Sequence, residues 1–272
     1  MNRIDGKIAV VTGGTQGLGR SIAKRFAESG AAGLVICGRN LKNGNFVKSE
    51  IKSKFNIRVE YVQADLANFN DCQRVIKKSD SCFGKVDILV NAAGLTDRGN
   101  LLNTSEELFD RMFAVNTKAP FFLMQGIVKI MIREKIFGSI INIGSTSALT
   151  GQPFIAPYSA SKGALATITR NSGYALLKNR IRVNQLNIGW MASDGEDRIQ
   201  KEYHGANDDW LLQASKDQPF GRLLETAEVA KAVTFLASAD SGMMTGSVIN
   251  FDQSVWGGYS FSPPKPDEEL QF

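Results

Sequence analysis

Tyr158 and Lys162 are spaced so that their side chains could share one proton-transfer site. A separation of four residues places two side chains on one face of a helix, one turn apart. A free tyrosine titrates near pH ~10, and a lysine ammonium beside it stabilises the tyrosinate and lowers that pKa. The pair could then act as a general acid or base at neutral pH. Ser145, thirteen residues before Tyr158, could hydrogen-bond the same reacting oxygen.

A glycine-rich turn near the N-terminus indicates a second kind of site. Residues 12–19 read TGGTQGLG and directly follow the apolar residues 8–11. Where a strand, a glycine turn and a helix follow one another, unpaired amides and the positive end of the helix face a bound anion. Glycines let the backbone approach that anion closely. The turn therefore predicts a dinucleotide site, although a plain βα connection has a similar composition.

The apolar pattern of the chain alternates between strands and helices. Helical spacing is clear, for example, at Leu18, Ile22 and Phe26 before Gly30. Short apolar runs typical of buried strands lie at residues 8–11, 34–37, 59–62, 88–90, 140–143, 183–186 and 248–251. This order predicts an α/β fold: one Rossmann-type, doubly wound domain over residues 1–260, with a seven-stranded parallel sheet and helices on both faces. Residues 261–272 are expected to form a loose tail, because residues 262–269 are rich in proline and acids.

Composition limits the kind of protein. A hydrophobic content of 43% and a charged content of 22% are typical of soluble globular proteins. No apolar run reaches the ~18 residues of a membrane span, so no membrane partner is expected. The three cysteines lack metal-site spacing, which indicates a reduced, cytoplasmic compartment and no metal. The net charge of +5 comes from scattered basic residues matched by 27 acids, so nucleic-acid binding is not expected.

From about Lys7 to Gly258 the chain resembles the short-chain dehydrogenase/reductase family. The motifs occur in the family's order. They are the Gly-x-x-x-Gly-x-Gly turn, Asp65 after the third strand, Asn91-Ala92-Ala93-Gly94, Asn116, Ser145, Tyr158 and Lys162. Asn116 lies in a long helix that begins with the capping pattern of residues 104–107. The resemblance implies an NAD(P)-dependent oxidoreductase that interconverts a secondary alcohol and a ketone by hydride transfer. Its implied catalytic set is Asn116, Ser145, Tyr158 and Lys162.

The resemblance also assigns a role to each of these positions. Tyr158 would exchange the proton of the substrate oxygen, and Lys162 would also bind the nicotinamide ribose. Asn116 would anchor a water molecule that links Lys162 to solvent, and Asp65 would hold the adenine amino group. The implied cofactor-binding residues are Gly13, Thr15, Gln16, Gly17, Leu18, Gly19, Arg39, Asp65, Leu66, Asn91, Ala92, Ala93, Gly94, Tyr158, Lys162, Gly189 and Met191.

Two positions bear on the cofactor and its loops. The end of the second strand carries Arg39 and no acid, and a guanidinium suits the 2′-phosphate of NADP through paired charged hydrogen bonds. NADP(H) is therefore favoured; the alternative is that Arg39 stacks on the adenine and NAD(H) binds as well. Ile188 stands where the family usually has proline before Gly189, which leaves the local loop geometry open.

Substrate selection is expected in an irregular lid at about residues 190–221. This segment and nearby loops supply the substrate candidates Arg98, Gln152, Phe154, Trp190 and His204. Such a mixture suits a small polar molecule with one apolar wall, for example a sugar or polyol; alternatively, the lid charges face water. Three other functions stay open: an NAD-linked sugar or polyol dehydrogenase, a 3-oxoacyl reductase, and a non-catalytic dinucleotide-binding sensor.

The pattern of two helical segments predicts a homotetramer. Residues 121–132 are apolar nearly all round, whereas a helix that packs on a sheet needs only one apolar stripe. Residues 157–178 are rich in small side chains that would let a partner helix approach closely. In the family these two helices form a four-helix bundle between subunits. Alternatively, loops of the same chain cover the surface.

Overall fold

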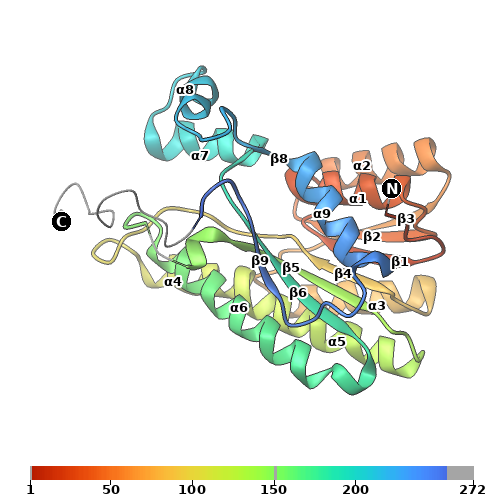
Figure 1. Cartoon of the computed structure of the whole chain (residues 1–272). Coiled ribbons are helices and arrows are strands. Elements are labelled where there is room, and N and C mark those ends of the chain that lie inside the picture. Colours follow the sequence, from red (N-terminus) through yellow and green to blue (C-terminus); the bar gives the residue numbers. More distant parts are fainter. Residues whose placement is uncertain (1, 150–151, 256–272) are drawn as a thin grey trace.

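Seven parallel strands form the central sheet, in the order β3-β2-β1-β4-β5-β6-β9 (Figure 1). The computed structural model describes residues 2–149 and 152–255, so the tail expected at 261–272 lies outside the described residues. The strands are β1 (Ile8–Thr12), β2 (Gly33–Gly38), β3 (Arg58–Gln63), β4 (Ile88–Asn91), β5 (Ser139–Ser145), β6 (Arg182–Ile188) and β9 (Val248–Phe251). Every strand expected from the sequence is confirmed.

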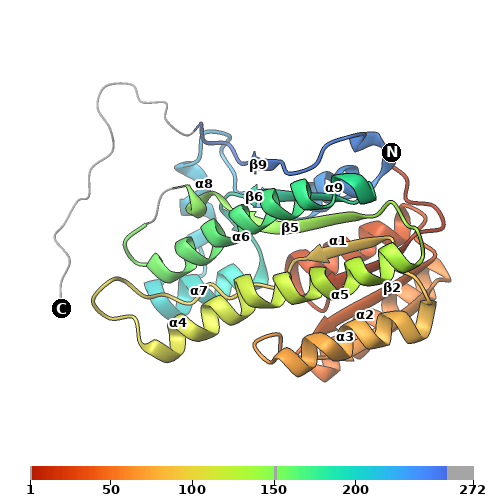
Figure 2. The same ribbon diagram turned by 90° about the horizontal axis from the view of Figure 1, so that it is seen from below.

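Helices cover both faces of the sheet because its central strands are apolar on both sides. In β1, Ala9 and Val11 pack toward α1, α2 and α9, whereas Val10 packs toward α3 and α5. Figures 1 and 2 show these two layers, with α6 beside α5. The helices are α1 (Gly17–Glu28), α2 (Leu41–Phe55), α3 (Phe69–Phe83), α4 (Glu106–Phe113), α5 (Ala119–Arg133), α6 (Ala156–Ala175), α7 (Asp194–His204), α8 (Trp210–Lys216) and α9 (Thr226–Ala237).

The strand order reverses between β1 and β4. The chain runs outward from β1 through β2 to β3, and then returns to β4 on the other side of β1. In doubly wound sheets, the loops at the carboxyl ends of the strands diverge at such a point and leave a crevice for a ligand. The topology therefore places the glycine turn after β1 and the loop after β4 at one crevice.

The long helix expected to start at residues 104–107 contains an interruption. Ser105 caps its start by accepting a hydrogen bond from the Leu108 amide at 3.2 Å. Between α4 and α5 the backbone winds into a π-helical turn, Ala114–Lys118. Such turns are rare and often occur at functional sites. The sequence contains no proline or glycine in this turn that would have indicated it.

A small second sheet was not expected from the sequence. Its strands β7 (Met191–Ala192) and β8 (Leu224–Glu225) pair in parallel and bracket the segment that carries α7 and α8. Figure 1 shows α7 and α8 standing apart from the two layers around the main sheet. Strands of two residues are too short to produce a periodic sequence signal. This pairing gives the segment after β6 a fixed point of attachment at each end.

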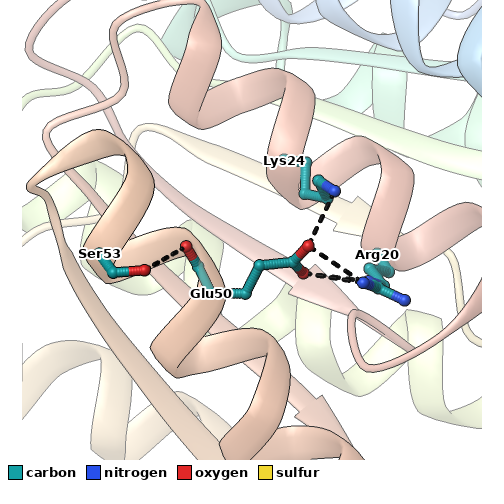
Figure 3. A network of polar contacts seen from close by, with 4 residues as sticks. All are labelled: Arg20, Lys24, Glu50 and Ser53. Carbon is teal, nitrogen blue, oxygen red and sulfur yellow. Dashed lines mark hydrogen bonds and ion pairs between the residues drawn. The ribbon is translucent and has the colours of Figure 1, made fainter.

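An ion-pair network joins α1 to α2 (Figure 3). Glu50 of α2 accepts hydrogen bonds from Arg20 at 2.9 Å and from Lys24 at 3.0 Å, both on α1. Burial acts to raise the pKa of the Glu50 carboxyl, but the two cations outweigh it and hold that pKa below its ordinary value. Because α1 follows the glycine turn and α2 follows Arg39, the network fixes two segments that flank the crevice.

Candidate active site

A single cavity of about 1730 Å³ runs along the loops that follow the strands. Most of the residues expected at the site line it. They are Gly13, Thr15, Gln16, Gly17, Leu18, Gly19, Arg39, Asp65, Leu66, Ala92, Ala93, Gly94, Arg98, Ser145, Gln152, Phe154, Tyr158, Lys162, Gly189, Trp190, Met191 and His204. Asn91 and Asn116 are buried behind its wall instead.

The glycine turn packs directly against the loop after β4. Gly13 has a φ of +65°, and a Cβ added to it would lie 2.9 Å from the Cα of Ala93. Thr12, which sequence reasoning did not single out, accepts hydrogen bonds from the amides of Ala92 and Ala93 at 2.9 and 3.0 Å. Only glycine combines this backbone conformation with so close a contact. The two backbone segments thus form one rigid edge of the cavity.

The far end of the cavity carries the residues that follow β2 and β3. Arg39 is exposed there, and no acid lies beside it at the end of β2. Asp65 accepts a hydrogen bond from Arg111 at 3.0 Å and from the Ala67 amide at 3.1 Å. Burial acts to raise the pKa of Asp65, but these bonds and the charges of Arg111 and Arg39 keep it below its ordinary value. Arg111, in the last turn of α4, is a cavity residue that sequence reasoning missed.

Ser145, Tyr158 and Lys162 meet where β5 ends and α6 begins. Ser145 is the last residue of β5, and its hydroxyl accepts a hydrogen bond from the Ser147 amide at 3.1 Å. The Lys162 ammonium is buried and donates to the Ile143 carbonyl of β5 at 2.8 Å. Its nitrogen lies 5.8 Å from the centre of the Tyr158 ring. The four-residue spacing therefore does place both side chains on one helix face.

The expected effect of the lysine on the tyrosine is wrong for this arrangement. Burial raises the pKa of Tyr158 above its ordinary value, Glu196 raises it further, and Ser145 and Arg98 act in the opposite direction. Burial also lowers the pKa of Lys162 to about 8. Burial is the largest effect on both side chains, and the Lys162 ammonium bonds to the Ile143 carbonyl. The phenol consequently stays protonated at neutral pH.

Asn116 supports the site from within the π-helical turn. Its amide oxygen accepts from the Leu95 amide at 2.8 Å, and its nitrogen donates to the Leu95 carbonyl at 2.9 Å and to the Ser161 hydroxyl at 3.0 Å. A Cβ placed on Gly94 would lie 3.7 Å from both the Asn116 oxygen and the Lys162 nitrogen. Asn116 thus ties the loop after β4 to α6, next to the lysine.

Asn91, expected near the cofactor, lies inside the sheet. Its amide nitrogen donates to the side chain of Asn142 on β5 at 2.8 Å. The bond joins β4 to β5 just below their carboxyl ends, so Asn91 supports the cavity without facing it.

In the loop after β6, Gly189 lies where a larger residue would not fit. A Cβ on Gly189 would collide with the side chain of Asp252. The Gly189 amide donates to the Phe251 carbonyl at 3.2 Å. Ile188, in place of the family's proline, completes β6 and pairs with Phe251 of β9. The geometry of this loop is therefore set by strand pairing, which does not require a proline.

Three of the expected substrate residues meet at the mouth of the cavity. The Arg98 Nε donates to the His204 Nε2 at 3.1 Å, and its guanidinium lies 5.4 Å from the centre of the Phe154 ring. The rings of Phe154 and His204 meet edge to face, 5.5 Å apart. Burial and the charge of Arg98 lower the pKa of His204. The neutral imidazole can therefore accept this hydrogen bond.

The other two candidates are held by neighbouring polar groups. The Trp190 indole donates to Glu196 at 2.8 Å and stacks against Trp210. Gln152 accepts from the Ser147 hydroxyl at 3.2 Å. Within residues 2–149 and 152–255, no group of three metal-ligating side chains is present, and no helix is long and apolar enough to cross a membrane.

Comparisons with known proteins agree with this geometry. The profile of a family described as short chain dehydrogenase matches residues 7–204. An uncharacterized oxidoreductase of Thermotoga maritima is 36% identical, over 91% of this chain and 96% of that protein. Galactitol 2-dehydrogenase of Agrobacterium fabrum is 30% identical, over 93% and 99%. The structure of L-sorbose reductase from Gluconobacter frateurii, complexed with NADPH and L-sorbose, is 28% identical and superposes with a TM-score of 0.89, covering 95% of this chain and 100% of that one.

The burial of Lys162 predicts a specific dependence of stability on pH. The folded protein disfavours the charged ammonium, because the pKa falls from an ordinary value of 10.5 to about 8. The penalty is complete below about pH 8 and disappears as the pH approaches 10.5. Between these values the unfolded chain binds more protons, so stability rises with pH. The free energy of unfolding of the wild type should therefore rise, relative to that of Lys162→Met, as the pH is raised from 7 to ~9.5.

Urea unfolding at a fixed protein concentration measures this difference. Lys178→Met is the control, because Lys178 is exposed in the same part of the chain. Parallel pH profiles for the wild type and Lys162→Met would contradict a buried, desolvated ammonium.

Proposed function

The chain belongs to the short-chain dehydrogenase family, and we propose that it interconverts a small polar secondary alcohol and its ketone with NADP(H) as the favoured cofactor. Family membership makes it an NAD(P)-dependent oxidoreductase. The observation that carries the proposal is that Ser145, Tyr158 and Lys162 line the same cavity as the glycine turn and Arg39.

The residues present fit a dinucleotide. Gly17 of the glycine turn lines the cavity, and a Cβ added to it would meet no protein atom within 4 Å, so the backbone amides of the turn can contact a pyrophosphate directly. Arg39 would hold a 2′-phosphate, and Lys162 the hydroxyls of the nicotinamide ribose. When bound, NADPH supplies the hydride that reduces the carbonyl carbon.

Tyr158 supplies the proton that completes reduction. As the carbonyl oxygen gains negative charge, Ser145 donates a hydrogen bond to it and the phenol of Tyr158 transfers its proton. A raised pKa keeps that phenol protonated at neutral pH, so the proton is available for transfer. Lys162, with a pKa of about 8, can take up or release a proton near neutral pH and so replace the one given away.

The alternatives fit the cavity less well. The similarity to galactitol 2-dehydrogenase supports an NAD-linked polyol dehydrogenase, but Arg39 stands where an acid would bind the ribose of NAD. A 3-oxoacyl reductase would bring an apolar chain past Arg98 and Glu196. A non-catalytic sensor would not require the complete set of Ser145, Tyr158 and Lys162. The similarity to a reductase complexed with NADPH and L-sorbose supports a ketose.

Arg39→Ala should weaken NADPH binding more than NADH binding, by roughly 1.5–3 kcal/mol, the contribution of a hydrogen bond to a charged group. The assay follows oxidation of NADPH and of NADH by the wild type and the variant, with a panel of ketoses, simple ketones and an acetoacetyl thioester.

Of the substrates in this panel, we expect a ketose to be reduced with NADPH. Arg3→Ala is the control, because Arg3 is exposed and lies outside the cavity. Equal losses for both cofactors would show that Arg39 does not bind the 2′-phosphate.

We also propose that the protein is a homotetramer. One face of α5 is buried against the sheet through residues such as Leu123 and Ile127, whereas Phe121 and Ile132 are exposed. In the described part of the chain, loops therefore leave these side chains uncovered. The small residues of α6, among them Ala160 and Gly163, would let a second copy approach closely.

Light scattering at micromolar concentration tests the assembly. We expect a mass of four times the 29.7 kDa of the chain, because apolar side chains of α5 would be buried between copies. Phe121→Ser should shift that mass toward smaller species. A wild-type mass equal to that of one chain would disprove the tetramer.

A further inference from the structure

Two charged residues outside the catalytic set face the cavity next to Tyr158. Glu196 of α7 and Arg98 of the loop after β4 both line it, and they come from segments that are far apart in the sequence. Their charges have opposite effects on the phenol, since Glu196 raises the pKa of Tyr158 and Arg98 lowers it. Both groups therefore lie within electrostatic range of the reacting oxygen.

Glu196 is held by one of its two oxygens. The Oε1 accepts hydrogen bonds from the Trp190 indole and from the side-chain Nε2 of Gln200, both at 2.8 Å. Within the described residues, its Oε2 has no hydrogen-bond partner. Trp190 in turn stacks against Trp210, which is buried and bonded to Asp197 at 2.8 Å. The carboxylate is thus fixed in position with one oxygen available as an acceptor.

Arg98 is held in a similar way. Its Nε donates to His204 at 3.1 Å, its Nη1 donates to the Thr96 carbonyl at 3.0 Å, and its plane lies against Phe154. Among the residues that the structure describes, its Nη2 makes no hydrogen bond. The guanidinium is half-buried, and this burial lowers its pKa. Arg98 therefore presents a preorganised donor to the cavity.

The two groups do not neutralise each other directly. Their charges interact, yet no ion pair joins Arg98 to Glu196 in the described part of the chain. A space with a donor on one side and an acceptor on the other suits a hydroxyl group, which accepts one hydrogen bond and donates another. A carboxylate would be repelled by Glu196, and an apolar group would leave both residues unpaired.

We propose that Arg98 and Glu196 form a specificity pair that binds a hydroxyl group near the reacting carbonyl and so selects neutral, polyhydroxylated ketones. This inference rests on the proposed function, since it presumes that the cavity reduces ketones. Arg98 donates through Nη2 to the hydroxyl oxygen, and the hydroxyl proton is donated to Oε2 of Glu196. Neither residue takes part in the proton transfer itself.

The test compares erythrulose with 2-butanone, two ketones with the same four-carbon skeleton. The quantity measured is the ratio of kcat/KM for the two ketones, with NADPH in excess. In the wild type this ratio should favour erythrulose. In Glu196→Gln and in Arg98→Met it should fall about 10- to 100-fold, which corresponds to the loss of one charged hydrogen bond. Glu202→Gln, an exposed change on the same helix, is the control and should keep the wild-type ratio.

The two variants also distinguish an effect on binding of the substrate hydroxyl from an effect on the pKa of Tyr158. Glu196→Gln removes a group that raises the pKa of the phenol, and Arg98→Met removes one that lowers it. Their pH profiles should therefore shift in opposite directions, although both lose the preference for erythrulose. If both ketones are reduced and the ratio is unchanged in the variants, the specificity pair is wrong while the proposed function stands. If no ketone is reduced by the wild type, both proposals fail.

Discussion

The contact between the Lys162 ammonium and the Ile143 carbonyl is the constraint on which the site depends. Burying an ammonium is costly, and here the cost is offset by a backbone acceptor, with no carboxylate of the described residues paired to it. Ile143 lies two residues before Ser145 on β5, and Lys162 lies one turn after Tyr158 on α6. This bond joins the helix to the strand, together with the bond that the Asn142 side chain of β5 donates to Thr169 of α6 at 2.9 Å. Burial of the ammonium, in contrast, lowers the pKa of the lysine to about 8.

The rest of the architecture brings the remaining groups to that point. The reversal of strand order opens the crevice between β1 and β4, and Thr12 then closes the glycine turn onto the following loop. Asn116 fixes the same loop from behind through a π-helical turn. The segment between β7 and β8 adds charged side chains such as Glu196 at the mouth. One edge of the cavity thus carries the glycine turn, and a separately attached edge carries α7 and α8.

The sequence alone predicted the sheet, because buried parallel strands are continuous apolar runs, and most of the residues that it predicted for the site line the cavity. It missed features that arise from tertiary packing. Arg111 reaches Asp65 across 46 positions of sequence, and nothing in the local pattern of α4 marks that contact. The pKa of Tyr158 was expected to fall, because spacing reveals a neighbouring charge but not the depth of burial, which here has the larger effect. The hydrogen bond from Arg98 to His204 likewise depends on the position of α7, which the local sequence does not reveal.

We propose that Tyr158 donates the proton in a cavity organised by Lys162. The most direct measurement compares kcat for ketone reduction in Tyr158→Phe with that in Tyr174→Phe, the same change at an exposed position of the same helix. NADPH affinity is measured in parallel. We predict that kcat falls at least ~100-fold in Tyr158→Phe, as expected when a general acid is removed, with NADPH affinity nearly unchanged and Tyr174→Phe fully active. If Tyr158→Phe were as active as Tyr174→Phe, Tyr158 would not be the proton donor.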